Sequence, residues 1–203
     1  ILAQAKSGLK LRKMSTCPLG YGDTKAEDQA KVPHDQAESS TKAEPLSGER
    51  ERSTIPSADG SNFLYPSEKQ FYASATAKGH QLNPNDMSMV IAIHNAVNER
   101  TWQDILKYEW LHHEDCAEPK LIRFLGRPGE LTPKARLGSL FGRTLPFDRH
   151  DWHVDRCGKH VRYVVDFYDG QQSATHPVSI HIDARPEVSF DGLKDRLLRW
   201  WHG

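Results

Sequence analysis

The pattern of apolar and polar positions changes near residue 60. Between residues 15 and 60 large apolar residues are sparse, and neither the two-residue period of a strand nor the 3.6-residue period of a helix persists. Such a segment cannot bury enough apolar surface to offset the entropy lost on ordering. We therefore predict a flexible leader over residues 1–60 and a folded domain over residues 61–203.

The folded part carries helical patterns in several places. Ser67 and Asn98 are suitable capping residues, and helical spacing follows each of them. A Thr-Pro pair at residue 132 is a typical helix start, because proline is well tolerated in a first turn. The last helix has Leu193, Leu197 and Trp200 on one face. Helices are predicted over 67–79, 98–110, 132–141 and 190–201, with a turn and possible helix start over 83–86 followed by an apolar run over 87–93.

Strand patterns lie between the third and the last of these helices. Residues 160–168 alternate apolar and polar side chains with a period of two, and residues 178–182 alternate again. Asp169-Gly170 between them is a turn signal. A short apolar run over 121–125 is also predicted to be extended. The expected fold class is α+β, with helices packed on a small antiparallel β-sheet behind the flexible leader.

The composition argues against a nucleic-acid-binding protein and against a fold held by disulfides or zinc. The 203 residues are enough for one core, and the formal net charge of zero gives no general attraction to nucleic acid, so we predict no nucleic-acid partner. The three cysteines (Cys17, Cys116 and Cys157) are far apart, and no Cys-x-x-Cys pair occurs. The sequence therefore indicates neither a disulfide framework nor a structural zinc site.

Individual residues give weaker signals. Among eleven histidines, His94 differs because it follows an apolar run and precedes Asn95, where a ring nitrogen could face a dry pocket. Any single histidine is more often a surface or core residue than a ligand. Cys157 beside Arg156 could have a lowered thiol pKa, but a small residue entering the turn at Gly158 is the favoured interpretation.

The six residues from Phe147 to Trp152 mix charged groups with two aromatic rings. A solvated loop does not need a tryptophan, so the segment suits a polar site walled by aromatics. Arg149 and Arg156 could pair with carboxylates in bidentate fashion. A structural Asp–Arg network at a sheet edge explains the same residues equally well, and both interpretations stay open.

The order of these motifs resembles the family of mitochondrial cytochrome c-type heme lyases (holocytochrome c synthases). The similarity covers about residues 63 to 201, and its most specific part is the run from Leu145 to Trp152. The other segments that carry it are Tyr65-Pro-Ser-Glu68, Asn83-Pro84, His94-Asn95, Asn98-Glu99, Arg123-Phe124, Asp155-Arg-Cys-Gly158, Arg162-Tyr-Val164, Asp166-Phe-Tyr-Asp-Gly170, Asp183-Ala-Arg-Pro186 and Trp200-Trp201.

The resemblance implies an enzyme that binds heme b and joins its vinyl groups, through thioether bonds, to the Cys-x-x-Cys-His cysteines of apocytochrome c, apocytochrome c1 or both. It also implies peripheral attachment to the mitochondrial inner membrane on the intermembrane-space side. A non-catalytic heme carrier or chaperone of that space is the alternative, because no residue of the chain is an obvious nucleophile.

The resemblance also implies site residues. His94 matches the family's axial ligand to heme iron, Glu99 and Arg156 match further catalytic positions, and Cys17-Pro18 matches a heme-associated motif in the leader. We further expect the heme site to contain propionate-binding arginines, a second ligand or proton donor and aromatic walls: Arg149 and Arg156, His150, and Phe63, Tyr65 and Trp152.

Two positions depart from the family pattern. Phe63 stands where the family has tryptophan, and the segment 138–142 replaces the family's Arg-Ser-Trp-Met-Gly. Apolar or aromatic character is kept at both, which predicts a rearranged pocket.

Overall fold

The computed structural model describes residues 45–127, 129–170 and 179–202. Cys17, expected to contact heme, lies outside these ranges. The elements are β1 (Arg52–Pro56), β2 (Asn62–Leu64), α1 (Glu68–Ala77), η2 (Pro84–Asp86), α2 (Met87–Glu109), η3 (Trp110–His112), β3 (Lys120–Gly126), α3 (Pro133–Leu140), β4 (Asp148–Arg156), β5 (Lys159–Asp169), β6 (Ile180–Pro186) and α4 (Phe190–His202). The α+β fold class predicted from the sequence is confirmed.

A four-stranded antiparallel sheet in the order β3-β4-β5-β6 forms the centre of the fold. On β4 and β5 the two faces differ in chemistry, as side-chain alternation in a strand requires. Trp152 lies opposite Tyr163 on the apolar face, whereas Asp151 lies opposite Val164 on the other. The alternation predicted over residues 160–168 is therefore a strand, and it turns one face of the sheet toward a helix.

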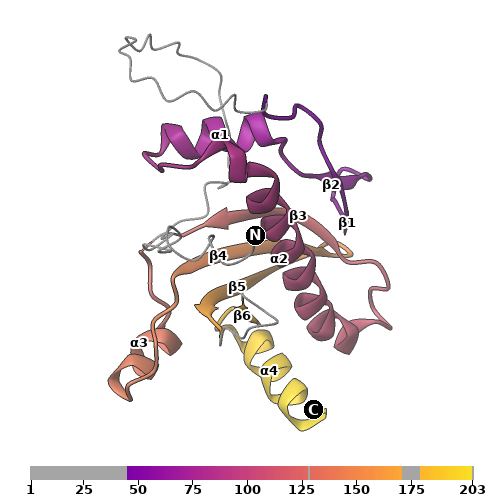
Figure 1. Ribbon diagram of the computed structural model, residues 1–203. Coiled ribbons are helices and arrows are strands. Elements are labelled where there is room, and N and C mark those ends of the chain that lie inside the picture. Colours follow the sequence, from indigo (N-terminus) through magenta and orange to yellow (C-terminus); the bar gives the residue numbers. More distant parts are fainter. Residues whose placement is uncertain (1–44, 128, 171–178, 203) are drawn as a thin grey trace.

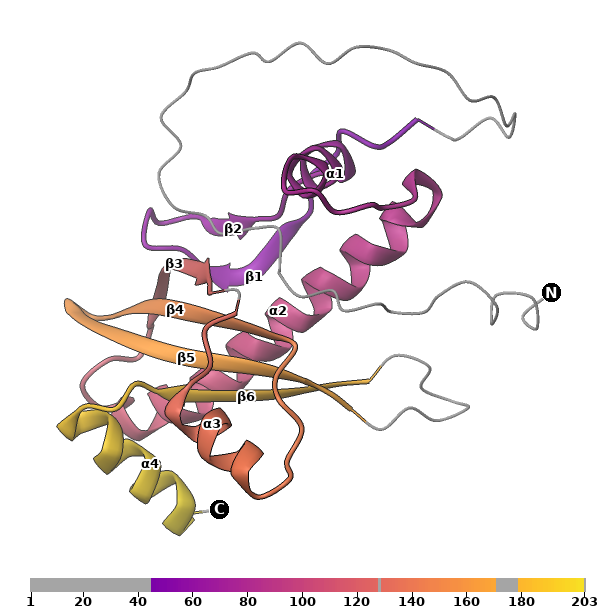
Figure 2. The same ribbon diagram turned by 90° about the vertical axis from the view of Figure 1, so that its left-hand side faces the viewer.

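Helix α2 crosses that apolar face (Figures 1 and 2). Its Trp102 and Ile105 are fully or almost fully buried against the sheet, with Trp152 and Val165 among their neighbours in the core. Burying a large apolar side chain contributes ~1.5–3 kcal/mol, so the two side chains together stabilise this helix–sheet contact by several kcal/mol. Helix α2 has 23 residues, and buried polar side chains occur in both of its halves.

The helix boundary predicted at Asn98 was wrong. Met87 to Glu109 is one helix, and the apolar run before His94 is its first half. Asn98 lies inside the helix and is 1% exposed. The error arose because asparagine is a strong capping residue when exposed, but here its amide contacts His94 on the same helix face.

The predicted end of the leader at residue 60 also needs correction. Residues 52–56 form β1, which pairs antiparallel with β2, and the side chain of Ile55 is fully buried in the main core. One apolar residue in a polar segment gives little periodic signal, and the strand is stabilised by contacts with distant residues. The described part of the folded unit therefore begins before residue 60.

Cys116 and Cys157 form a disulfide, which the sequence analysis did not predict. Cys157 and Gly158 are the two loop residues between β4 and β5, and both have positive φ, as a type I′ hairpin requires. Cys157 therefore does enter the turn at Gly158, as favoured above. The bond ties this hairpin to the loop that follows η3. Two cysteines 41 residues apart give no local signal of pairing.

The other predicted helices, α1 with its Ser67 capping box, α3 with its Thr132 cap, and α4, are confirmed within two residues. The strand predicted over 178–182 is β6, which extends four residues further, to Pro186. Within the described ranges, the helices are all too short or too polar to cross a membrane.

Candidate functional site

His94 lies in the first half of α2, where the helix passes α1. Its ring meets the edge of Phe71 at 5.3 Å between centroids, and its Nδ1 atom lies 3.2 Å from the amide nitrogen of Asn98, one turn later. The side chain is half-buried. A partly solvent-exposed imidazole that is held by an aromatic edge and an amide is suitable for binding a metal centre from outside.

The contact with Asn98 bears on which ring nitrogen can act. Iron coordination through Nε2 requires the ring proton on Nδ1, and the group facing Nδ1 must then accept a hydrogen bond. The amide of Asn98 meets this need if its oxygen, rather than its nitrogen, faces the ring, and the two orientations are interchangeable by rotation. Asn98, rather than Glu99, is therefore the neighbour on α2 that can orient the ring of His94.

Glu99 instead joins α2 to the β1–β2 ribbon. One carboxylate oxygen accepts hydrogen bonds from the hydroxyls of Ser53 at 2.5 Å and Tyr65 at 3.0 Å, and the other accepts from the hydroxyl of Thr54. Burial alone would raise the pKa of Glu99, but the hydrogen bonds from Ser53 and Thr54 outweigh it and lower the pKa. Burial and the charge of Glu99 raise the pKa of Tyr65. This cluster fixes the ribbon beside the helix turn that follows His94.

We expect Glu99→Gln to lower the free energy of unfolding by about 1 kcal/mol at neutral pH, at the modest end for charged hydrogen bonds because solvent reaches the carboxylate. The folded-state pKa is lowered, so the stabilisation is complete above the unfolded value of about 4.3 and is lost as pH falls through the folded pKa. Urea unfolding of both proteins across pH 3–7 measures this. A difference that stays constant down to pH 3 would contradict it.

The predicted aromatic wall is a row of rings inside the core. Phe63 contacts Tyr65 at 5.6 Å and Phe124 at 5.4 Å, and Phe124 stacks on Trp152 at 5.1 Å. Trp152 and Tyr65 are buried, whereas Phe63 is half-buried. Of these three rings, only that of Phe63 is exposed enough to contact a ligand. Trp152 instead stabilises the sheet beneath it.

Arg149 and His150 lie on opposite faces of β4. Arg149 donates to Asp151 at 2.9 Å and contacts Glu130 at 3.4 Å, on the polar face of the sheet. His150 is buried on the apolar face, with its Nε2 3.2 Å from Asp148 and its ring near Phe124 and Phe167. Of the two interpretations left open for this segment, the Asp–Arg network describes Arg149 in this structure.

Arg156 lies at the other end of β4 in a buried cluster. Its guanidinium donates to both carboxylate oxygens of Glu109, at 2.7 and 3.0 Å, and to the hydroxyl of Tyr163 at 3.2 Å. Burial would lower the pKa of Arg156, but the hydrogen bond and charge of Glu109 raise it; burial and the same carboxylate raise the pKa of Tyr163. The arginine is 5% exposed, and its Nε and Nη2 donors are already used within the fold.

The structure therefore brings together some of the predicted site residues and separates others. His94, Glu99, Phe63 and Tyr65 lie around the first half of α2 and the ribbon. Arg156 pairs with Glu109, 15 residues beyond His94, which corresponds to roughly 22 Å along a helix axis. A heme propionate does not extend that far from the iron, so one heme in this conformation cannot contact both ends.

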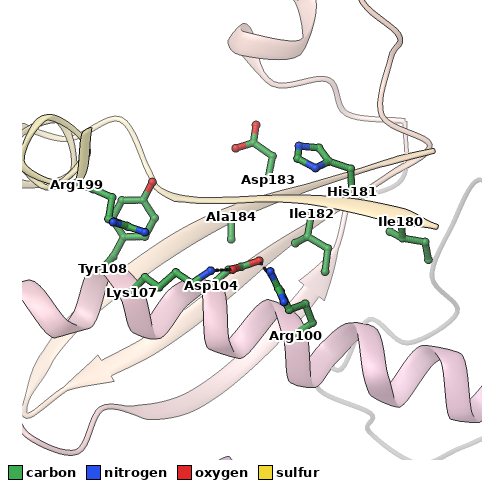
Figure 3. A pocket seen from close by; sticks show the side chains of 10 residues that line it. All are labelled: Arg100, Asp104, Lys107, Tyr108, Ile180, His181, Ile182, Asp183, Ala184 and Arg199. Carbon is green, nitrogen blue, oxygen red and sulfur yellow. Dashed lines mark hydrogen bonds and ion pairs between the residues drawn. The ribbon is translucent and has the colours of Figure 1, made fainter. Parts of the chain in front are cut away.

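A cleft of about 520 Å³ lies elsewhere, between α2, β6 and α4 (Figure 3). Its floor includes Ile182 and Ala184, and the basic side chains of Arg100, Lys107 and Arg199 line it. Of the predicted site residues that the structure describes, none lines this cleft. Asp104 at the centre pairs with Lys107 at 2.5 Å and contacts Arg100 at 3.6 Å. Its negative charge therefore offsets part of the positive charge of the cleft.

The sequence did not reveal that Asn98 and Glu109 make buried polar contacts. Asn98 was interpreted as a cap, and Glu109 was given no role. The available signal was spacing, because Asn98 is four residues after His94 and Glu109 continues the inward face of Trp102 and Ile105. A carboxylate on an apolar face predicts a buried cationic partner.

Comparisons with known proteins identify the family. The profile of the family described as cytochrome c/c1 heme lyase matches residues 28–200. A Schizosaccharomyces pombe protein that carries the name of a holocytochrome-c1 synthase is 47% identical over 164 residues, which are 76% of this chain and 75% of the relative. No solved structure matches the chain.

Relatives named holocytochrome c-type synthase occur in vertebrates. The protein from Gallus gallus is 41% identical over 201 residues, covering 91% of this chain and 73% of the relative. The protein from Homo sapiens is 43% identical over 165 residues, covering 77% and 62%. With a family profile that spans most of its length and relatives above 40% identity, the chain belongs to the cytochrome c/c1 heme lyase family.

Proposed function

We propose that this chain is a holocytochrome c-type synthase, which binds heme b as a substrate and attaches it to an apocytochrome. The observation that supports this most directly is His94, a half-buried imidazole held by Asn98 and Phe71, within a chain of the heme lyase family. Imidazole is a common axial ligand of heme iron. His94 is the proposed ligand on one side of the iron, and the histidine of the substrate's Cys-x-x-Cys-His takes the other side.

The proposed reaction adds each substrate thiol across a heme vinyl group. A carbon–sulfur bond forms at one vinyl carbon, and the thiol proton is delivered to the other, so the atoms balance without a leaving group. Positioning can supply much of the catalysis, because well-oriented partners gain roughly 7–11 kcal/mol. Ligation of the iron from both sides sets the register between thiols and vinyl groups.

The neighbours of His94 have supporting roles in this proposal. Asn98 keeps the proton on Nδ1 so that Nε2 presents its lone pair to iron. Glu99 holds the β1–β2 ribbon, and with it half-buried Phe63, beside the histidine. Phe63 and Tyr65 then form the aromatic side of the heme site. Arg156 acts through Glu109 on the shape of the helix–sheet contact and does not touch the heme.

The proposed partners are heme and apocytochrome c, apocytochrome c1 or both, since relatives carry names of either kind. The proposed location is the mitochondrial inner membrane, attached peripherally on the intermembrane-space side.

The test is co-expression of this chain with apocytochrome c and, separately, apocytochrome c1, followed by a heme stain after denaturing electrophoresis. A synthase leaves heme on the substrate band under denaturing conditions. An apocytochrome with both cysteines replaced by alanine is the control and should carry no stain. A heme carrier would instead purify with a Soret band and leave the substrate unstained, and that outcome would replace the synthase proposal.

A further inference from the structure

Helix α4 has its amphipathic faces reversed relative to an ordinary surface helix. A surface helix normally turns its apolar stripe to the core and its polar side to water. In α4 the apolar side chains share one face, and that face is exposed. It consists of Phe190, Leu193, Leu197, Trp200 and Trp201. Trp200 and Trp201 are 76% and 77% exposed.

The polar face of α4 is the one that packs on the protein. Asp195 is 2% exposed. Its carboxylate lies 2.9 Å from Nε2 of His112 and 3.6 Å from the guanidinium of Arg156. Arg196 donates to the backbone oxygen of Pro186. These contacts fix the rotation of the helix about its axis, so the apolar stripe cannot turn inward without breaking them.

A second apolar surface lies at the same end of the molecule. The end of α3 exposes Leu137, Leu140 and Phe141, the last two at 81% and 78%. Both views place α3 and α4 together at the end of the molecule away from α1 (Figures 1 and 2). Several large apolar side chains exposed at one end of a molecule are typical of an interaction site.

The charged residues around α3 and α4 indicate the charge of the partner that these helices would bind. Residues 133–145 contain three basic and no acidic residues, and α4 adds three basic and two acidic residues, in a chain whose net charge is zero. Arg136, Arg143 and Lys194 are exposed. Apolar and tryptophan side chains beside exposed basic groups are typical of helices that lie in the interface of an anionic bilayer.

We propose that the outward faces of α4 and α3 form a docking surface for an anionic phospholipid membrane. Helix α4 has 13 residues and is therefore about 20 Å long, with a polar face along that length, so it lies in the plane of the membrane surface. Its five apolar side chains enter the acyl boundary, and Arg136, Arg143 and Lys194 contact lipid phosphates. This inference deepens the membrane attachment proposed above by assigning it to particular residues.

The orientation has a consequence for the proposed reaction. The His94 end of α2 lies near α1, at the end of the molecule opposite α4 (Figure 1). A protein docked through α4 holds that end away from the lipid, where a water-soluble apocytochrome can reach it.

The test is co-sedimentation of the full chain with phosphatidylcholine vesicles, with and without phosphatidylglycerol. Binding is expected to need the anionic lipid and to weaken as salt is raised. Leu197→Glu and Trp200→Glu should each reduce the bound fraction roughly ten-fold or more, as for one large apolar group withdrawn from an apolar phase. Met89→Glu changes an exposed apolar residue on the first turn of α2 and should bind normally.

Phe141→Glu on α3 provides an independent variant if either α4 substitution prevents folding, which thermal unfolding would reveal. Equal binding by the α4 and α3 variants and the wild-type chain would overturn the proposal. A lipid-free dimer that Leu197→Glu dissociates would assign the surface to a second copy of the chain. Heme attachment measured in detergent separates the two proposals: the Leu197→Glu variant should retain it, whereas a wild-type chain without it would contradict the synthase and not the docking surface.

Discussion

Replacing His94 by alanine should abolish the Soret absorption of co-purified heme and reduce the yield of holocytochrome by more than ~10-fold. Residues that merely orient a metal ligand cost ~10–100-fold when changed, and the ligand itself should cost at least as much. The fold should survive, because His94 is half-buried and lies outside the main core. The measurements are the absorption spectrum of the purified chain and a heme stain of the co-expressed substrate.

His113→Ala is the matched control for that experiment. His113 is an exposed histidine beyond the far end of α2, with its Nδ1 2.8 Å from the backbone oxygen of Trp110 and its ring stacked on that tryptophan. Its removal should leave heme binding unchanged. Imidazole added to the His94→Ala variant should restore part of the Soret band if the side chain acts as a ligand. Normal heme retention by His94→Ala would remove the ligand role.

The elements that the sequence predicted best are those whose signal is local. The alternation in β5, the cap of α1 at Ser67 and the Thr-Pro start of α3 each depend on a few neighbouring residues, and each was confirmed. Apart from the helix boundary wrongly placed at Asn98, the errors involve contacts between distant residues. Ile55 is ordered by the core that it enters, and Cys116 and Cys157 meet because β4 and the loop after η3 lie side by side.

The same division applies to the candidate site. The identity of His94 as the most distinctive histidine came from its place after an apolar run, and the structure gives it a half-buried position beside Phe71. The sequence could not predict that Arg156 lies far from His94, because that distance depends on where β4 crosses α2. A charged motif in a sequence does not say whether its partner is a ligand or another residue of the chain. For Arg156 that partner is Glu109.

The Arg156–Glu109 pair is an unusual feature of the core because both side chains are at most 5% exposed. An ion pair in such surroundings contributes little compared with apolar residues of the same size, yet removal of one partner leaves an uncompensated charge. Tyr163 depends on the same carboxylate, to which its hydroxyl donates at 2.6 Å. The cluster therefore couples the end of α2 to β4 and β5.

Glu109→Ala should lower the free energy of unfolding by about 3–5 kcal/mol, with Asp195 at 3.6 Å from Arg156 holding the loss toward the lower figure. Urea unfolding measures it, and an unchanged midpoint would contradict the structural role. The double variant Glu109→Ala with Arg156→Met removes both charges and should recover part of the loss. The double variant also separates structure from heme binding: if it folds and retains heme, Arg156 acts through the fold, and if it folds but loses heme, the guanidinium contacts a propionate after all.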